Sequence, residues 1–312
     1  MKFKEKNIVC FGGGTGLPTL LSGLKHNPFF KITAIVNMFD SGGSSGELKD
    51  RFGILPPGDV LKCLLALSEN EIYARQILLK RINNFKFPGH TGGNALLLGL
   101  EKVFGDYLTA IDALGQLLAV RGQVVPVTQE PATLCAQYDD GTIYKSETSI
   151  DIGVREGKRI ERIFLEPEIS ASPAALEAIK NADFICIGPG SFYTSVLSNF
   201  LPVGIQKALQ ESRARTIFIA NFLTEGKGMQ NMYLEDIVAI AEKYIGRKLD
   251  YIITNDNWPE ELLAKYCSES KYPIISQKNV DKRAMEAELW QDKIVARHDS
   301  ARLAGLIAGL VV

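Results

Sequence analysis

The first residues that could do chemistry form a glycine-rich loop near the start of the chain. This loop consists of Gly12, Gly13, Gly14, Thr15 and Gly16. Glycine lets backbone N–H groups approach a phosphate closely, and a helix that begins after such a loop adds free donors and the positive end of its dipole. The run is not GxGxxG, which needs glycine where Leu17 stands, and it lacks the GK[ST] of a P-loop. It therefore predicts anion binding, with a tight turn that binds nothing as the alternative.

A second loop, residues 40–46, is rich in glycine and serine and follows the next expected strand. Its candidate ligand contacts are Asp40, Ser41, Gly43, Ser44 and Ser45. Such a loop can form an anion nest, and Asp40 could bind a ribose hydroxyl or Mg²⁺. Ligands of open α/β sheets sit outside the carboxyl ends of the strands, so its position favours binding over a merely flexible loop. Asp59, after two prolines and a glycine, is expected to cap a helix rather than hold a metal.

Small, polar or amide-bearing residues follow several other expected strands or open a helix. The further candidates are His90, Asn94, Gly188, Gly190, Ser191, Tyr193, Asn221, Thr224, Tyr266 and Arg297. His90 could meet a phosphate or lie on the surface, and Tyr266 could stack on a base or belong to the core. Arg297 could hold a base or a phosphate, and Asp299 or Ser300 could cap the last helix. The sequence contains no Ser-His-Asp, Cys-His or metal-spaced pattern, so no general base is assigned.

The elements that must position these residues alternate between short apolar runs and helical patterns. The expected strands are residues 7–11, 31–37, 184–187, 216–220, 251–254 and 294–297. The expected helices are residues 17–25, one capped by Asp59 that runs to residue 67, and residues 94–104, 108–118, 173–180, 234–245 and 259–267. This alternation predicts a doubly wound, mostly parallel, Rossmann-like α/β sheet.

A change of pattern in the middle of the chain predicts a small antiparallel insertion at about residues 121–168. Its expected strands are residues 123–126, 133–138, 142–146 and 160–165, with a hairpin signal at Asp139-Asp140-Gly141. We expect one α/β domain over residues 1–312 that contains this insertion.

Composition excludes several classes of protein. Lys and Arg number 35 against 36 Asp and Glu, for a net charge of -1, whereas proteins that bind duplex phosphate usually have a basic excess. The five cysteines are scattered and form no CxxC pair, which is against a disulfide framework or zinc site and fits a reducing compartment. No apolar run is long enough to span a membrane, and the first residues do not resemble a signal peptide. We therefore expect a soluble cytoplasmic protein that binds no nucleic acid.

Four motifs together resemble the family shared by 2-phospho-L-lactate transferase and the bacterial gluconeogenesis factor. They are GGGTGL (12–17), DSGGSSGELKDRFGILPPGD (40–59), GHTGGN (89–94) and GPGSFYTS (188–195). They occur in order and span nearly the whole chain. The transferase branch implies transfer of a lactyl-phosphate group from a guanosine diphosphate carrier to a deazaflavin precursor, with magnesium. The other branch implies binding of UDP-sugars and a link to central carbon metabolism and to control of the cell wall and cell shape.

The loop GGSSG followed by ILPPGD resembles the gluconeogenesis-factor branch. Asp59 matches the position of a metal-binding acid in the transferase, but Ser41 stands where the family often has a second acid. The resemblance also implies that Tyr266 and Arg297 contact the uracil end of the ligand. The leading hypothesis is a regulator that binds a UDP-sugar, with UDP-N-acetylglucosamine expected, and acts through a regulatory protein partner or as a homo-oligomer. The alternative is a transferase that uses Mg²⁺, the one cofactor implied, to move a phosphoester group from a nucleotide diphosphate-linked donor. A dinucleotide-binding protein is a weaker third.

Overall fold

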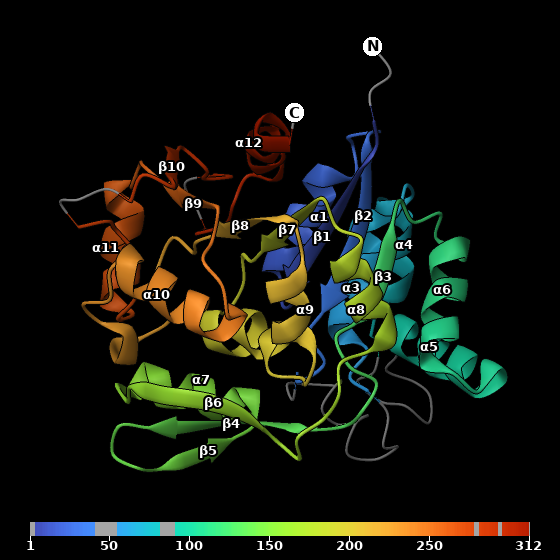
Figure 1. Ribbon diagram of the computed structural model, residues 1–312, viewed down its shortest axis with the longest axis horizontal. Helices are drawn as coiled ribbons and strands as arrows, with labels where there is room; N and C mark the ends of the chain where they lie inside the picture. The colour runs from blue at the N-terminus through green and yellow to red at the C-terminus, as the bar shows by residue number, and fades with distance from the viewer. Residues whose placement is uncertain (1–3, 41–54, 82–90, 278–280, 293–294, 312) are drawn as a thin grey trace.

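The computed structural model describes residues 4–40, 55–81, 91–277, 281–292 and 295–311. Its main sheet has seven parallel strands in the order β10-β9-β8-β7-β1-β2-β3, and a separate three-stranded antiparallel sheet has the order β5-β4-β6 (Figure 1). The predicted α/β class, with a parallel sheet and a small antiparallel one, is confirmed. Among the described residues, no helix is both long and apolar enough to cross a bilayer.

The parallel strands are β1 (Lys6–Gly12), β2 (Phe30–Val36), β3 (Gln123–Pro126), β7 (Phe184–Ile187), β8 (Arg215–Ile219), β9 (Tyr251–Asn255) and β10 (Ala284–Ala287). The antiparallel strands are β4 (Thr133–Tyr138), β5 (Ile143–Lys145) and β6 (Ile160–Glu166). The α-helices are α1 (Gly16–Leu24), α3 (Gly58–Leu67), α4 (Glu71–Leu78), α5 (Gly92–Phe104), α6 (Tyr107–Leu117), α7 (Glu147–Glu156), α8 (Pro173–Lys180), α9 (Ile205–Glu211), α10 (Leu234–Ile245), α11 (Glu260–Ser268) and α12 (Ser300–Val311). Three short turns of other helix types are η1 (Phe192–Val196), η2 (Leu197–Phe200) and η3 (Lys227–Met229).

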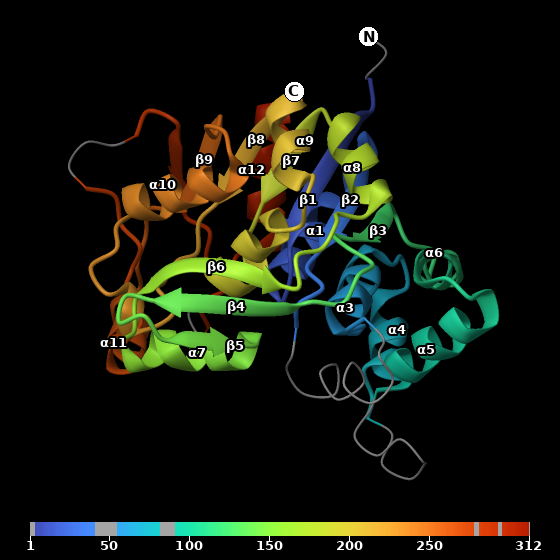
Figure 2. The ribbon, with the colours of Figure 1, turned by 60° about the horizontal axis from the view of Figure 1, so that its bottom comes forward.

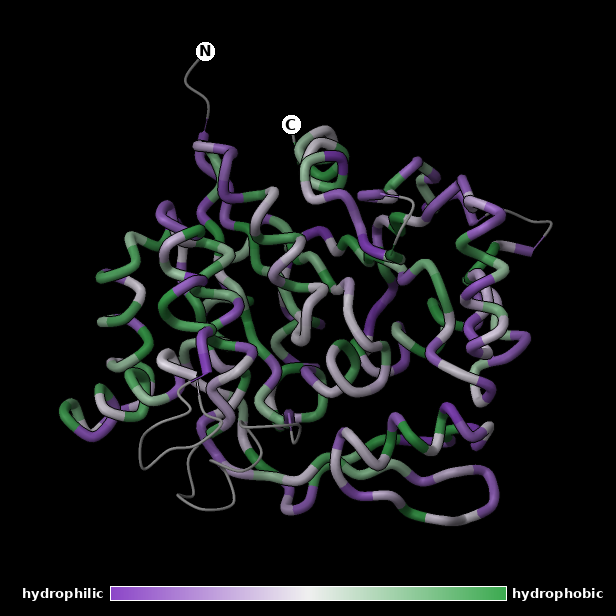
Figure 3. Tube along the Cα trace, turned by 180° about the vertical axis from the view of Figure 1, so that it is seen from behind, coloured by the Kyte–Doolittle hydropathy of each residue, from purple (hydrophilic) through white to green (hydrophobic). Residues whose placement is uncertain are grey.

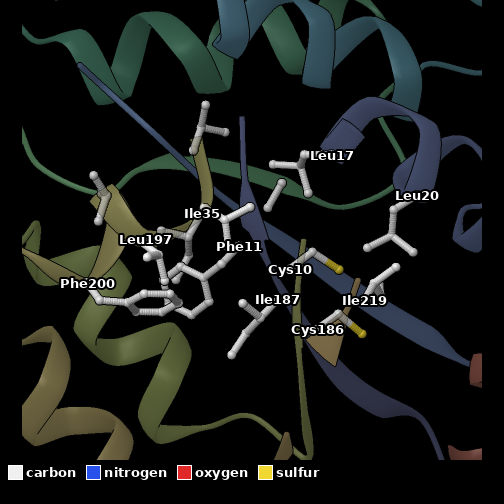
Figure 4. Close-up of a cluster of buried hydrophobic side chains, with 14 of the residues drawn as sticks. Cys10, Phe11, Leu17, Leu20, Ile35, Cys186, Ile187, Leu197, Phe200 and Ile219 are labelled. Carbon is white, nitrogen blue, oxygen red and sulfur yellow. The ribbon is translucent and has the colours of Figure 1, made fainter. Parts of the chain in front are cut away.

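The centre of the core is the pair β1 and β7, two strands far apart in the chain. They pair in parallel, with Cys10 opposite Cys186 and Phe11 opposite Ile187. All of these side chains are buried, because a parallel sheet covered by helices on both faces needs apolar residues on both. Figure 4 shows the cluster, in which Phe11 packs on Phe200 with 5.3 Å between ring centroids. The two cysteines thus act as small hydrophobic residues, as predicted.

The antiparallel sheet and α7 form a layer beside the edge at which β1 and β7 end (Figures 1 and 2). A hydrogen bond ties this layer to the main sheet, because the Thr194 hydroxyl in η1 donates to the Asp151 carboxylate in α7 at 3.3 Å. Figure 3 shows hydrophobic residues along the central strands and hydrophilic ones at the outer hairpin of this layer. The layer therefore forms a wall over the carboxyl ends of the parallel strands.

Two predicted strand placements are wrong. Residues 123–126 form β3, which pairs in parallel with β2 from Thr33↔Gln123 to Val36↔Pro126, so this strand is the edge of the main sheet and not part of an insertion. Residues 295–297 form no strand; the last strand is β10, parallel to β9, and His298 makes only an isolated bridge to Trp290. The AMEA sequence of β10 has no β-branched residue, so the pattern gave little signal there. Helices α4, α7 and α9 were also not predicted.

Candidate functional site

The carboxyl edge of the parallel sheet holds a cleft with a volume of about 430 Å³. Its walls come from the amino end of α1, the segments after β7 and β8, helices α7 and α11, and residues 295–298. Eight predicted ligand contacts line it together: Thr15, Gly16, Gly190, Ser191, Asn221, Thr224, Tyr266 and Arg297. Ligand binding by these residues stays a prediction, but the structure brings them into one place.

The glycine loop enters the cleft through the first turn of α1. Gly14 has a φ of +62°, in the left-handed region that favours glycine. Gly16 lies so close to the segment after β7 that a Cβ atom there would overlap the carbonyl oxygen of Pro189. Thr15 precedes α1 and makes no side-chain capping bond. Because Thr15 and Gly16 line the cleft, the amino end of the helix and the positive end of its dipole face the cleft. Gly12 and Gly13 lie behind this turn, outside the cleft lining.

The segment after β7 is fixed by two hydrogen bonds with the Asn221 amide, which lies in the segment after β8. The Asn221 amide donates to the carbonyl oxygen of Gly190 at 2.6 Å, and the Gly190 N–H donates back to the Asn221 oxygen at 3.2 Å. The Ser191 and Thr194 hydroxyls lie 2.7 Å apart. Gly188 has a φ of +85° and runs close to the Ile219 carbonyl. These contacts pre-organise a polar wall opposite the amino end of α1.

The other end of the cleft combines an aromatic ring with the positive charges of Arg297 and Lys271, of which Lys271 is paired with Glu269. Tyr266 is nearly buried, and its hydroxyl accepts a hydrogen bond from the Ala296 N–H at 3.0 Å. This bond positions Arg297, whose exposed guanidinium makes no ion pair or side-chain hydrogen bond within the described part of the chain. Lys271 lies 5.4 Å from the centroid of the Tyr266 ring. An aromatic face with two cations beside it is suited to a base and an anionic group.

His298 lines the same end of the cleft but is 93% buried, since only 7% of it is exposed. Its ring packs on Phe222 with 4.0 Å between centroids, and burial lowers its pKa to about 4. The imidazole is therefore neutral at physiological pH. Its Nε2 atom has no hydrogen-bond partner among the described residues, which is uncommon for a buried polar atom.

Tyr193 and Asn94 are predicted contacts that lie away from the cleft lining, as Gly12, Gly13, Gly14, Asp40 and Gly188 also do. Tyr193 is buried in η1, where its ring meets that of Phe192 edge-on at 5.1 Å. Asn94 is buried in the first turn of α5, and its N–H donates to the Thr91 hydroxyl at 3.2 Å. Ligand binding by either residue stays a prediction. Five other predicted contacts lie outside the described residues: Ser41, Gly43, Ser44, Ser45 and His90.

The prediction that Asp59 caps a helix is wrong. The residue before α3 is Pro57, so Asp59 falls inside the first turn, and its carboxylate points across to the glycine loop. It accepts the Gly14 N–H at 2.6 Å and pairs with the Lys62 ammonium at 2.8 Å. Asp59 thereby holds Gly14 in its left-handed conformation.

The magnesium site implied by the transferase branch can be tested against this arrangement. Burial alone lowers the pKa of Lys62, but attraction to Asp59 and Asp40 outweighs it and keeps the pKa above its usual value. The lysine thus supplies positive charge to both predicted metal-binding acids. Within the described ranges, no group of three or more His, Cys, Asp or Glu side chains is placed to hold a metal. The described residues therefore fit a pair of carboxylates, Asp59 and Asp40, that Lys62 neutralises, better than a metal site.

Four charged residues of the cleft wall were not predicted from the sequence: Asp151, Arg155, Glu225 and Lys271. Asp151 and Arg155 are four residues apart, on one face of the unpredicted helix α7. Glu225 directly follows Thr224, so the pattern of polar strand ends could have included it. Burial raises the pKa of Glu225 to about 7, although its bond from the Phe192 N–H works in the opposite direction.

A second carboxyl group with a raised pKa leads to a testable stability profile. Burial, and then a hydrogen bond with Asp40, raise the pKa of Glu147 from 4.5 to about 9. Because the folded state holds this proton more tightly, its contribution to stability is complete below pH 4.5 and is lost as pH rises toward 9.

Glu147→Gln mimics the protonated form. By denaturant titration, we expect the variant to exceed the wild type by about 1–2 kcal/mol at pH 8 and to match it near pH 4.5. Glu156→Gln, exposed on the same helix, is the control and is expected to show no such divergence.

Comparison with known proteins identifies the family. The protein-family model described as 2-phospho-L-lactate transferase CofD matches residues 8–295, so the chain belongs to this family. The chain is 37% identical to the putative gluconeogenesis factor of Thermotoga maritima over 310 residues, which are 96% of this chain and 98% of that protein. It is 36% identical to the gluconeogenesis factor of Bacillus subtilis, with 99% of each chain covered.

The fold is shared with a solved structure. The crystal structure of a UPF0052 family member from Bacillus halodurans has a TM-score of 0.90 and 37% sequence identity, and the match covers 98% of this chain and 99% of that one. The resemblance drawn from the four motifs is therefore confirmed at the level of the family and its gluconeogenesis-factor members.

Proposed function

We propose that this protein binds a nucleotide sugar, with UDP-N-acetylglucosamine as the expected ligand, and regulates central carbon metabolism and cell-wall and cell-shape homeostasis. The main support is that the amino end of α1 shares one cleft with Tyr266 and Arg297. The names of the relatives, gluconeogenesis factors, agree with a regulatory role. A protein partner or self-association would read the liganded state, because occupancy matters only if the ligand binds two conformations unequally.

The cleft has a suitable group for each part of such a ligand. The diphosphate would meet the first turn of α1 at Thr15 and Gly16, where the backbone N–H groups and the helix dipole attract anions without a net positive charge. The base would stack on Tyr266 beside Arg297. The glycosyl group would extend toward the polar wall formed by Ser191 and α7. The volume of the cleft, about 430 Å³, lies within the range usual for small-molecule sites.

The family description favours one alternative, a magnesium-dependent transferase that uses a nucleotide diphosphate-linked donor. Asp59 beside Gly14 is its best candidate residue for a metal near the diphosphate. The ion pair between Asp59 and Lys62 weakens this alternative, because a metal would have to displace the lysine.

Calorimetric titration separates the two proposals. The protein is titrated with UDP-N-acetylglucosamine and with GDP, each with and without Mg²⁺, and both ligands are then recovered and analysed. Tighter binding of the UDP-sugar without a need for Mg²⁺, with the ligand intact, supports the regulator. Magnesium-dependent preference for GDP supports the transferase, and no binding of either ligand would contradict nucleotide binding altogether.

A further inference from the structure

We propose that Asp151 and Glu225 select the group beyond the diphosphate, by accepting hydrogen bonds from the hydroxyls of a neutral sugar and by repelling an acidic one. This inference rests on the proposed function, because it concerns the glycosyl end of the same ligand. Both residues line the cleft, and neither was anticipated from the sequence.

The two carboxyl groups flank a line of hydroxyls. Asp151 accepts from the Thr194 hydroxyl at 3.3 Å, and Thr194 lies 2.7 Å from the Ser191 hydroxyl. Ser191 is in turn hydrogen-bonded to Glu225, and the nearby charge of Asp151 helps to raise the pKa of Glu225. A sugar ring presents adjacent hydroxyl groups that can each donate a hydrogen bond. The arrangement of carboxylates and hydroxyls matches that pattern of donors.

Backbone contacts hold both carboxyl groups in place. Glu225 accepts the Phe192 N–H at 2.5 Å, which ties the segment after β8 to η1. On the other side, Gly226 and Gly228 lie so close to the backbone of α7 and the turn after it that any Cβ would collide. The antiparallel layer fixes α7 from behind, because the buried Tyr138 hydroxyl donates to the Ile150 carbonyl at 2.9 Å. A fixed site of this kind can discriminate between ligands, because moving the carboxylates away from a poor ligand would disrupt packing.

The charges of the site would favour a neutral sugar over an acidic one. Arg155 is exposed at the rim and is the positive side chain nearest to Asp151 along α7. A carboxylate on the ligand would meet two acidic groups in a partly enclosed wall, where like charges repel strongly. An independent feature shows that this cleft is suited to a ligand with hydrogen-bond donors. The side chain of His298 in the same lining is only 7% exposed, and its Nε2 atom has no hydrogen-bond partner in the described part of the chain.

The test compares UDP, UDP-glucose and UDP-glucuronate by calorimetry at pH 8, where the two sugars differ in one carboxylate. We expect the wild type to bind UDP-glucose at least about tenfold more tightly than UDP-glucuronate. In Asp151→Asn and Glu225→Gln, which keep side-chain shape, this preference is expected to fall by at least about fivefold, while affinity for UDP stays within about twofold. Glu156→Gln, on α7 but outside the cleft lining, is the matched control and should retain the full preference.

The outcomes distinguish this inference from the proposed function. If UDP binds but the wild type takes both sugars equally, the selection by Asp151 and Glu225 is wrong and nucleotide binding stands. The same conclusion follows if the preference survives in both folded variants. If UDP and both UDP-sugars fail to bind, the proposed function itself is overturned, and this inference with it. The wild-type comparison needs no variant to fold, so it decides the question even if a substitution is not tolerated.

Discussion

Gly16→Ala is expected to lower the free energy of unfolding by about 3 kcal/mol. The methyl group would overlap the Pro189 carbonyl oxygen, and the Gly190 N–H would also be too close. Neither neighbour is the flexible end of a side chain; both are backbone, so α1 or the segment after β7 must shift. Because the two hydrogen bonds between Asn221 and Gly190 fix that segment, relieving the strain would cost further free energy. Equilibrium denaturation in urea measures the effect.

The matched control is Gly305→Ala in α12, where a Cβ would meet no atom of the described residues within 4 Å. Alanine is favoured over glycine inside a helix, so this variant is expected to gain up to about 1 kcal/mol. Opposite signs for the same chemical change would identify the backbone contact as the cause. A loss of less than about 0.5 kcal/mol for Gly16→Ala would show that the close approach of α1 and Pro189 is not as described.

Gly14→Asp is expected to weaken UDP-sugar binding by about 100-fold or more. The substitution places a negative charge on the loop at the amino end of α1, where the proposal puts the diphosphate. The fold should tolerate it, because aspartate is among the residues that adopt a left-handed backbone. Among the described residues, a Cβ at Gly14 would approach only the Ser195 hydroxyl, at 3.5 Å. Calorimetry measures the affinity, and a thermal melt confirms that the variant is folded.

Gly14→Asn separates charge from shape in this experiment. Asparagine has nearly the same size and the same tolerance of a left-handed backbone, but no charge. We expect it to lose about tenfold or less. Equal losses for the two variants would assign the effect to space rather than to repulsion, and unchanged affinity for both would contradict the assignment of this loop to phosphate.

Most of the parallel sheet was predictable from the sequence because its strands are buried on both faces. Segments such as β1 and β7 are short apolar runs bounded by glycines or polar residues, and parallel strands leave this pattern. The candidate site was predictable to the same extent, since glycines and amides such as Asn221 follow these strands directly. The close approach of Gly16 to Pro189 depends on the pairing of β1 with β7, which no local pattern specifies.

The unpredicted part of the site lies where local patterns are weak. Helix α7 buries only Ile150, Gly153 and Val154, so its apolar face is too narrow to stand out from its polar residues. The edge strand β10 is only partly buried, and tertiary pairing with β9 rather than intrinsic preference places it. Asp59 was assigned to a cap because caps are local, whereas its partner Gly14 is 45 residues away.

The pairing of β1 with β7 also determines when the cleft can exist during synthesis. The glycine loop is made within the first 16 residues, but its opposite wall begins at Pro189, and the aromatic and cationic end is complete only at His298. A ribosome-bound chain would therefore carry an open, one-sided glycine loop for most of its translation. Premature termination between residues 288 and 295 would leave all seven parallel strands encoded but no Arg297, together with loss of the α12 contact at Gly23. The proposed ligand site is thus completed late, after most of the core has been made.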